Sequence, residues 1–363
     1  MKTEEAQVLT LLRMALWSGE TDDGLLSASS DWDTILRIAE KQSVQGLVAS
    51  AILSWLERNN VESGIEQACL ATKFRTLQGN EHVNDVLGEV FRILRSAGFS
   101  PVLVKGQGVA RYYPEPMLRM AGDIDLYLGG EAERAGEMLA QFADHDTFHK
   151  DKDEKHINLA MKGVEVELHR QIIAHIPCTP VKVMEPWLTD GLLPQNCRTA
   201  VIAANDITVP SLMLDVVYVF YHLWYHIMHS GIGLRQLCDL MMILHCHHGE
   251  VDIKRLEPLL RQAHLLREWQ VMGTILVNFL GLPKNEFPLY NRSLARIGRM
   301  QLREILRLGN FGKEDYNGFL EGNTSHGWCH RLRTMLFFMR RDGYNFLMYP
   351  RTTIDVRASF YIR

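Results

Sequence analysis

The stretch Leu118-Arg-Met-Ala-Gly-Asp-Ile-Asp-Leu-Tyr-Leu128 places two carboxylates, Asp123 and Asp125, one residue apart in an apolar segment with the pattern of a β-strand. Side chains at positions i and i+2 of a strand leave the same face roughly 6.5–7 Å apart. We therefore expect both acids to point one way while the apolar residues between and after them are buried. Two carboxylates on one face suit a divalent metal ion, although an Asp-x-Asp pair alone also occurs at solvated strand ends.

A glycine turn precedes this strand in the chain. Residues 101–108, Pro-Val-Leu-Val-Lys-Gly-Gln-Gly, form an apolar strand that runs into two glycines, and residues 109–113 have the pattern of a helix start. Glycines at such a turn let backbone N–H groups approach a phosphate at a helix N-terminus. A lysine before the turn can reach phosphate oxygens, or can simply end the strand. The candidate nucleotide-binding residues here are Lys105, Gly106, Gln107 and Gly108.

A third acidic element follows at Gly163-Val-Glu-Val-Glu-Leu-His-Arg170. Its strict alternation predicts a strand with Glu165, Glu167 and His169 on one face and apolar residues on the other. Alternation alone does not separate Glu165 from Glu167 as a third metal ligand. Strand, glycine turn, helix, Asp-x-Asp strand and a later acidic strand is the order needed to hold two divalent ions against a triphosphate.

This order resembles the polymerase-β-type nucleotidyltransferase superfamily, and within it the bacterial family of uncharacterised nucleotidyltransferases. The resemblance covers residues 80–245. This chain departs from it at Gly106-Gln107-Gly108, where many superfamily members have Gly-Ser after the first strand. We therefore expect Lys105 and backbone amides, rather than a serine, to hold the phosphates. The stretches that carry the resemblance are Val104-Lys105-Gly106, Tyr113-Pro-Glu-Pro-Met-Leu-Arg119, Gly122-Asp-Ile-Asp-Leu126, Glu167-Leu-His169, His226 and Gly231-Ile-Gly-Leu-Arg-Gln-Leu-Cys-Asp239.

The resemblance implies a transferase that binds Mg²⁺ or Mn²⁺ and moves a nucleoside monophosphate from ATP or another NTP to a hydroxyl or phosphate acceptor, with release of pyrophosphate. It implies that Asp123 and Asp125 bind the metal ions, and it favours Glu167 over Glu165 as the third catalytic ligand. The sequence does not identify the acceptor.

Two arginines have two interpretations each. Arg119 can place its guanidinium on a phosphate or pair with an acid. Arg235 can pair with Asp239 one turn further along its helix, whereas the resemblance implies that it contacts the nucleotide. On the preceding helix, His222, His226 and His229 follow one stripe at i, i+4 and i+7 spacing. We expect a polar stripe facing the cleft rather than a zinc site, because no His-Glu-x-x-His motif is present.

Two other functions stay open. One is a non-catalytic module that binds a nucleotide or a partner, against which the presence of all three acids weighs. The other is a toxin-like transferase acting on tRNA through the arginine-rich, aromatic residues 326–363. Solvated helix faces explain the same tract, and a net charge of −4 provides no global attraction to nucleic acid. A nucleic-acid partner is therefore not favoured.

We expect a cytoplasmic protein from its cysteine usage, its N-terminus and the length of its apolar runs. Its six cysteines are scattered without a Cys-x-x-Cys, which favours a reducing compartment over a disulfide framework or a zinc knuckle. The N-terminus carries acids where a secretory signal needs positive charge, and the longest apolar run is too short to span a membrane. We expect no membrane partner.

The periodicities predict an α+β fold in which a small mixed β-sheet, the nucleotidyltransferase core, is embedded between mainly α-helical N- and C-terminal regions. The predicted helices lie in residues 4–17, 32–58, 65–97, 131–143 and 211–280, and strands in residues 147–173 turn at Lys162-Gly163. Five prolines in residues 176–210 indicate connecting segments with at most short helices. The expected units are residues 1–76 (helical), 77–175 (catalytic core), 176–210 (connection) and 211–363 (helical).

Overall fold

The computed structural model describes residues 1–17, 22–150, 156–172, 178–310 and 339–358. Its N-terminal part is helical, as predicted, but residues 32–58 form two helices because Ser43 adopts a left-handed φ of 56° between them. Asp31 caps the first of these by accepting a hydrogen bond from the Thr34 N–H. The helices are α1 (Thr3–Leu16), α2 (Trp32–Lys41), α3 (Gln45–Asn59) and α4 (Glu66–Ser96).

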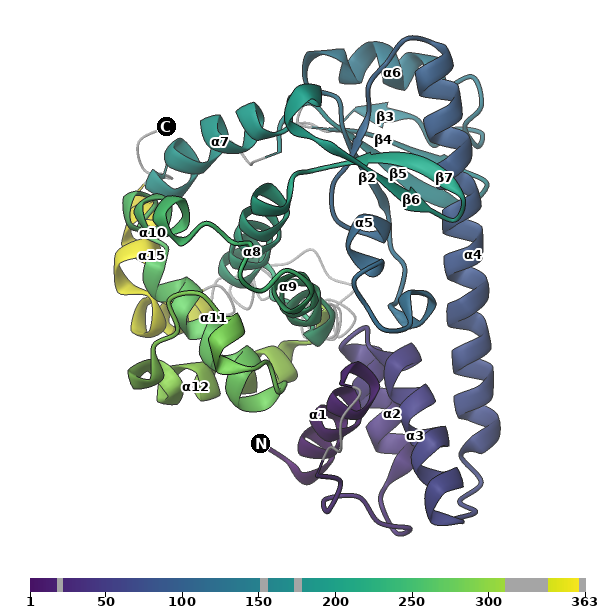
Figure 1. Ribbon diagram of the computed structural model, residues 1–363, viewed down its shortest axis with the longest axis vertical. Helices are drawn as coiled ribbons and strands as arrows, with labels where there is room; N and C mark the ends of the chain where they lie inside the picture. The colour runs from purple at the N-terminus through teal and green to yellow at the C-terminus, as the bar shows by residue number, and fades with distance from the viewer. Residues whose placement is uncertain (18–21, 151–155, 173–177, 311–338, 359–363) are drawn as a thin grey trace, which may run out of the picture.

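Helix α4 is 31 residues long and joins the N-terminal helices to the sheet (Figure 1). Its first half packs on α3. Its second half packs on α6 (Ala132–Leu139) and on the apolar face of the sheet. The expected boundary between residues 76 and 77 falls inside this helix. The N-terminal helices and the core thus share one continuous element.

The sheet is mixed and has five strands in the order β1-β2-β5-β4-β3. Strand β2 runs parallel to β5, and the other pairs are antiparallel. The predicted turn at Lys162-Gly163 is present, and both residues have positive φ, 52° and 78°, as a two-residue hairpin requires. The strands are β1 (Val102–Leu103), β2 (Ile124–Tyr127), β3 (His149–Lys150), β4 (His156–Met161) and β5 (Val164–His169).

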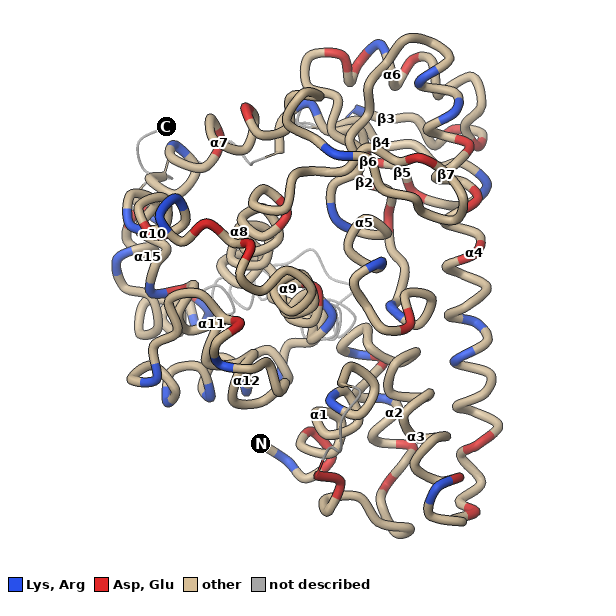
Figure 2. Tube along the Cα trace, viewed as in Figure 1, with Lys and Arg blue, Asp and Glu red and all other residues tan. Residues whose placement is uncertain are grey.

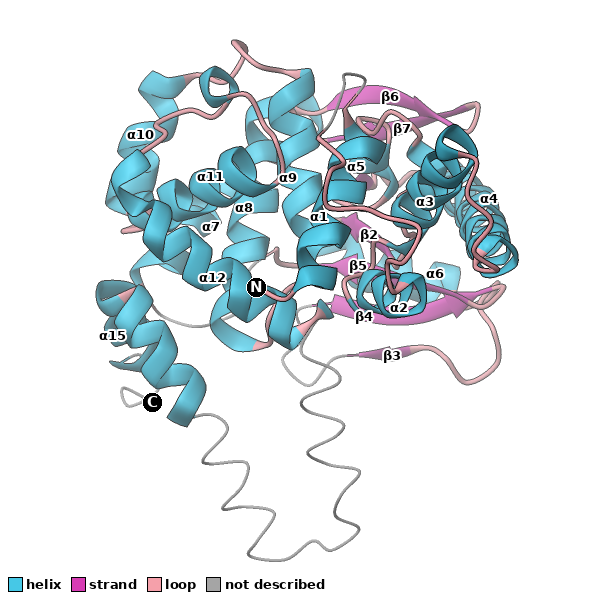
Figure 3. Cartoon of the chain, turned by 90° about the horizontal axis from the view of Figure 1, so that it is seen from below, coloured by secondary structure: helices cyan, strands magenta, loops and turns pink. Residues whose placement is uncertain are grey.

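One face of this sheet is core. Ile124 and Leu126 of β2 and Val166 and Leu168 of β5 are at most 1% exposed and pack with residues of α4 and α6. Because strand side chains alternate between faces, the charged residues of β2 and β5 must lie on the opposite face. That face is turned toward the C-terminal helices (Figure 3).

The prediction of at most short helices in residues 176–210 was wrong. Helix α7 (Thr179–Gly191) is 13 residues long, with Pro180 in its first turn, where a missing N–H costs little, and Pro186 inside it. A hairpin of β6 (Arg198–Ile202) and β7 (Asn205–Val209) follows. Because β7 packs on β1 and α4, the hairpin belongs to the core rather than to a linker.

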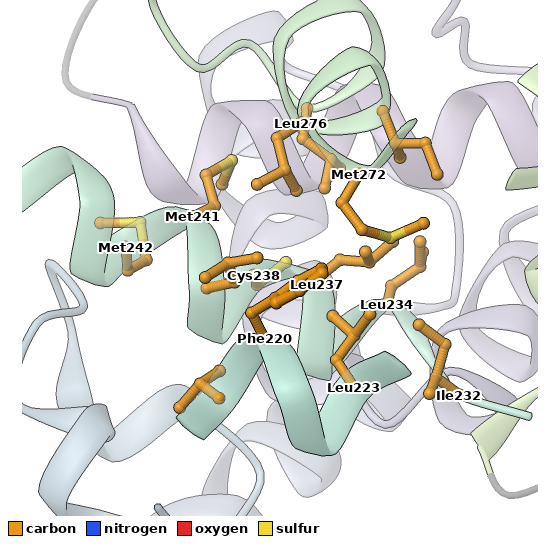
Figure 4. Packing of buried hydrophobic residues seen from close by; sticks show 14 of the residues in the cluster. Phe220, Leu223, Ile232, Leu234, Leu237, Cys238, Met241, Met242, Met272 and Leu276 are labelled. Carbon is orange, nitrogen blue, oxygen red and sulfur yellow. The ribbon is translucent and has the colours of Figure 1, made fainter. Parts of the chain in front are cut away.

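The C-terminal part is helical as predicted. Phe220, Leu237 and Met272, from three different helices, are at most 1% exposed and form the centre of its core (Figure 4). Truncating such a residue to alanine costs about 2–5 kcal/mol. The helices are α8 (Leu212–His229), α9 (Leu234–Cys246), α10 (Ile253–Gln262), α11 (Leu266–Phe279), α12 (Ala295–Leu308) and α15 (Pro350–Ala358), and residues 339–348 are also helical.

Residues 311–338, between α12 and the helix at residues 339–348, lie outside the described residues. None of the described helices is long and apolar enough to cross a membrane.

Candidate metal and nucleotide site

Three carboxylates meet where β2 and β5 run side by side. Asp123 directly precedes β2, Asp125 lies on it, and Asp125 is paired in parallel register with Glu167 of β5. One ligand oxygen from each of the three lies within 4.8 Å of the others. Glu165 is exposed and lies outside this cluster. Of the two candidate glutamates, the fold brings Glu167 to the aspartates.

Asp125 is the most enclosed of the three acids, at 2% exposure. Its Oδ1 atom accepts from Lys105 Nζ at 2.9 Å and from His169 Nε2 at 2.8 Å. His169 Nε2 also lies 3.5 Å from Glu167 Oε2. One ammonium and one ring N–H therefore compensate the charge of the central carboxylate.

The three acids have different electrostatic environments. Burial acts to raise the pKa of Asp125, but the Lys105 ammonium and the hydrogen bond from His169 outweigh it and lower this pKa to about 2. The charge of Asp125, together with burial, raises the pKa of Asp123. Burial and the charges of both aspartates raise the pKa of Glu167 to about 8. Glu167 is thus the proton-holding member of the cluster near neutral pH.

The glycine turn presents Lys105 to this cluster. Lys105 and Gly106 have φ of 71° and 52°, and the left-handed conformation costs a non-glycine residue about 1–2 kcal/mol. Burial acts to lower the pKa of Lys105, but the carboxylate of Asp125 outweighs it, so this pKa lies above its ordinary value. Lys105 is therefore an ammonium held in a strained turn, which is a common feature of functional sites.

The rest of the turn faces away from the acids. Gln107 begins the short helix α5 (Gln107–Ala110), is 6% exposed, and donates its side-chain N–H groups to Asn80 and Asn84 of α4. Gly108 is buried against apolar side chains. Neither residue lines the pocket described next, whereas Lys105 and Gly106 do.

A pocket of about 440 Å³ lies between the charged face of the sheet and helices α8 and α9. It has the size of a small-molecule site, and charged groups and aromatic rings converge in it. The sheet side supplies the carboxylates and His156 and His169, and the helix side supplies tyrosine, histidine and arginine. The charged and aromatic lining residues are Lys105, Arg119, Arg235, Asp123, Asp125, Glu167, Asp239, Tyr218, Tyr221 and Tyr225.

Arg119 forms an ion pair with Asp239 of the same chain. Its Nε and Nη2 atoms donate to the two oxygens of Asp239 at 2.6 and 2.8 Å, and Tyr113 donates its hydroxyl to the same carboxylate. Arg119 is 3% exposed. This bidentate ion pair occupies Asp239, the carboxylate that the sequence also suggested as a partner for Arg235. It connects the loop before β2 to α9.

Arg235 is bound more loosely. Its Nη1 donates to the Met120 carbonyl at 3.2 Å, its Nε is buried without a hydrogen-bond partner among the described residues, and no carboxylate of the described chain lies within ion-pair distance. Burial and the charge of Arg119 lower the pKa of Arg235. Arg235 is the pocket cation best able to accept an anionic ligand.

A chain of polar groups leads from Lys105 into α8. Lys105 Nζ lies 3.2 Å from His222 Nε2, which lies 3.1 Å from His226 Nε2, and His226 Nδ1 lies 2.9 Å from Ser230 Oγ. A lysine can only donate, so His222 Nε2 accepts. Burial and the charge of Lys105 lower the pKa of His222 well below its usual range and that of His226 to about 4. Both imidazoles are neutral at pH 7.

Sequence reasoning missed Tyr218 and His156. Tyr218 is 3% exposed and lies among apolar residues in the sequence of α8, which gave no sign of its position. His156 could have been found, because a two-residue hairpin turn at Lys162-Gly163 fixes the strand register and puts residue 156 opposite His169.

The basic C-terminal tract is only partly described. Lys and Arg recur along α10, α12 and α15 (Figure 2). Arg340 is exposed, Arg341 is partly buried, and Arg357 pairs with Asp342. Arg331, Arg333 and Arg363 lie outside the described residues.

Comparison with family models identifies the family of the chain. Residues 28–281 match the model of the uncharacterised nucleotidyltransferase family. The chain belongs to this family. The matched residues include all of α2 to α11 and the whole candidate site.

Among solved structures, the chain is similar to an antigenic nucleotidyltransferase-like protein from Paracoccidioides brasiliensis. The two share 13% identity with a TM-score of 0.35, over 56% of this chain and 93% of that chain. No curated protein matches the chain.

Proposed function

We propose that this nucleotidyltransferase transfers a nucleoside monophosphate from an NTP to a hydroxyl or phosphate acceptor in a reaction that depends on Mg²⁺ or Mn²⁺ and releases pyrophosphate. The observation that carries the proposal is the parallel register of Asp125 with Glu167, which gathers three carboxylates on one sheet face beside a pocket. The family supports nucleotidyl transfer as the reaction class.

The donor set fits a hard divalent ion. Mg²⁺ takes oxygen ligands, commonly one or two carboxylates together with substrate phosphates and water, and Asp123, Asp125 and Glu167 offer carboxylate oxygens within 4.8 Å of one another. We assign Asp123 and Asp125 to both ions and Glu167 to the catalytic one. When bound, the metal ions neutralise charge on the attacking and leaving oxygens.

The nucleotide would lie against the cations of the pocket. Lys105 of the glycine turn and Arg235 of α9 both line the pocket, and both are charged donors suited to phosphate oxygens. We assign Lys105, Gly106 and Arg235 to the triphosphate. Gln107 and Gly108 support the turn from behind, and Arg119 positions α9 through Asp239.

The reaction is a substitution at the α-phosphorus. An acceptor oxygen forms a bond to this phosphorus, the bond to the bridging oxygen of pyrophosphate breaks, and a hydroxyl acceptor loses its proton. We assign proton removal or orientation of the acceptor to Glu167, because a carboxylate at the catalytic metal ion would lie beside the attacking oxygen. Positioning and charge neutralisation account for most catalysis of this kind.

The acceptor class can be found by labelling. The purified protein is incubated with each α-³²P-labelled NTP, Mg²⁺ or Mn²⁺, and a cell extract split into protein, RNA and small-molecule fractions. We expect one fraction to take up label with the wild-type protein and none to do so with Asp123→Asn. Absence of transfer to every fraction, with every NTP and both metals, would contradict the proposal.

A further inference from the structure

A second set of metal-binding side chains lies beside the three carboxylates, on the same sheet face. His156 of β4 stands directly opposite His169 of β5 in the antiparallel register, and their ring centroids are 5.5 Å apart. Glu167 precedes His169 by two residues, so both point to that face. One ligand atom from each of the three lies within 4.8 Å of the others.

This set has a different chemistry from the aspartate pair. Two imidazoles and one carboxylate are donors that suit first-row transition metals such as Zn²⁺, whereas Mg²⁺ prefers oxygen ligands. Three protein ligands with room for a fourth is the usual arrangement of a reactive zinc site. All three residues line the pocket, so an ion and a further ligand can reach them.

A buried amide on the same face supports a ligand here. Asn158 pairs with Glu167 in the β4–β5 register and shares its face with His156, because Ile157 and Leu159 between and beyond them are core residues. Asn158 is 8% exposed, and its Oδ1 has no hydrogen-bond partner among the described residues. A buried carbonyl oxygen without a hydrogen-bond partner is unfavourable, and a bound ion or its water would supply that partner.

We propose that His156, Glu167 and His169 bind a Zn²⁺-type transition-metal ion next to the site assigned to Mg²⁺. Glu167 belongs to both donor sets, since the two oxygens of one carboxylate can serve two ions. The inference goes beyond nucleotidyl transfer and stands without it, because it rests on the donor set and its register alone.

The test is calorimetric titration of the metal-free full chain with Zn²⁺. The matched variants are His156→Ala and His156→Gln, of which the second keeps a polar side chain of similar reach. His149→Ala is the control, because His149 is an exposed histidine on the neighbouring strand β3 and outside the donor set. Circular dichroism and thermal unfolding report whether each variant is folded.

We expect saturable Zn²⁺ binding that weakens at least about tenfold in both His156 variants and is unchanged in His149→Ala, since loss of an outer-shell partner alone costs about 10–100-fold. Asp123→Asn should keep this binding while it weakens Mn²⁺ binding, so failure here and failure of the proposed reaction are distinguishable. As a second readout, Co²⁺ should give visible absorption bands that disappear with His156. Zn²⁺ affinity that is equal in a folded His156 variant and in wild type, or absent in both, would overturn the proposal.

Discussion

Lys105 Nζ lies 2.9 Å from Asp125 Oδ1, and this buried ion pair connects the glycine turn to the Asp-x-Asp strand. The side chain of Lys105 is 18% exposed and that of Asp125 is 2% exposed, so water screens the pair little. Asp123 has no such partner at ion-pair distance among the described residues. The two aspartates of one motif therefore differ in what they do for the fold.

Asparagine substitutions should separate these two roles. Asp125→Asn should abolish transfer and also lower the free energy of unfolding by about 3 kcal/mol, because it leaves a buried ammonium without its carboxylate. Asp123→Asn should abolish transfer with unchanged or slightly higher stability, because it removes repulsion from Asp125. Urea unfolding of both variants, with transfer measured in parallel, checks this. Equal losses of stability in the two variants would contradict the assignment.

The third ligand is tested by a pair of glutamates on one strand. Glu167→Gln should lower turnover by about 100-fold or more, because it removes both a metal ligand and the proposed base. NTP affinity should change little. Glu165→Gln is the matched control, with the same substitution two residues away at an exposed position, and its kinetics should equal wild type. Steady-state kinetics on both variants decides between them, and a larger defect in Glu165→Gln would refute the site register.

The two pocket arginines should give opposite results. Arg119→Gln should lower the free energy of unfolding by about 3–5 kcal/mol, because Asp239 would keep a buried charge without its partner. Arg235→Gln should leave stability almost unchanged and weaken NTP binding about tenfold or more, as expected for loss of a charged donor to phosphate. Thermal unfolding and equilibrium NTP titration of both variants measure this. Wild-type NTP affinity in Arg235→Gln would remove this arginine from the nucleotide site.

Metal affinity should depend on pH through Glu167. Burial and two neighbouring carboxylates raise its pKa to about 8, so a metal ion that binds its carboxylate at pH 7 must displace a proton. Mn²⁺ affinity should rise with pH up to about 8, by at most about tenfold per pH unit, and level off above it. Calorimetry at pH 7 in buffers of different ionisation enthalpy should detect the released proton. In Glu167→Gln the release should disappear, and a release of equal size in that variant would assign the proton to another group.

Much of the fold follows from local patterns. The alternation in residues 164–169 predicted a strand with its acids on one face, and the Lys162-Gly163 turn predicted the hairpin that pairs it with β4. The prolines in residues 176–210 led to the wrong prediction of at most short helices, because a proline in the first turn of a helix destabilises it little. That β6 and β7 extend the core is visible only from tertiary packing.

The site was predictable in its motifs but not in its partners. Parallel pairing of β2 with β5 depends on a long crossover, so the sequence shows three acids but not that Glu167 stands beside Asp125. The sequence also does not show that Arg119 forms an ion pair with Asp239, which is 120 residues further along the chain. Long-range ion pairs of this kind form when helices dock on the sheet, and no local period reports them.

The central claim is that this chain transfers the α-phosphoryl group with its nucleoside, using the carboxylates on β2 and β5. The most direct measurement compares label uptake by the responsive acceptor fraction from α-³²P-NTP and from γ-³²P-NTP, for wild type and Asp125→Asn. Uptake from the α label only, lost in Asp125→Asn, is the predicted result. Uptake from the γ label, or α-label uptake that persists at the wild-type rate in folded Asp125→Asn, would contradict the account.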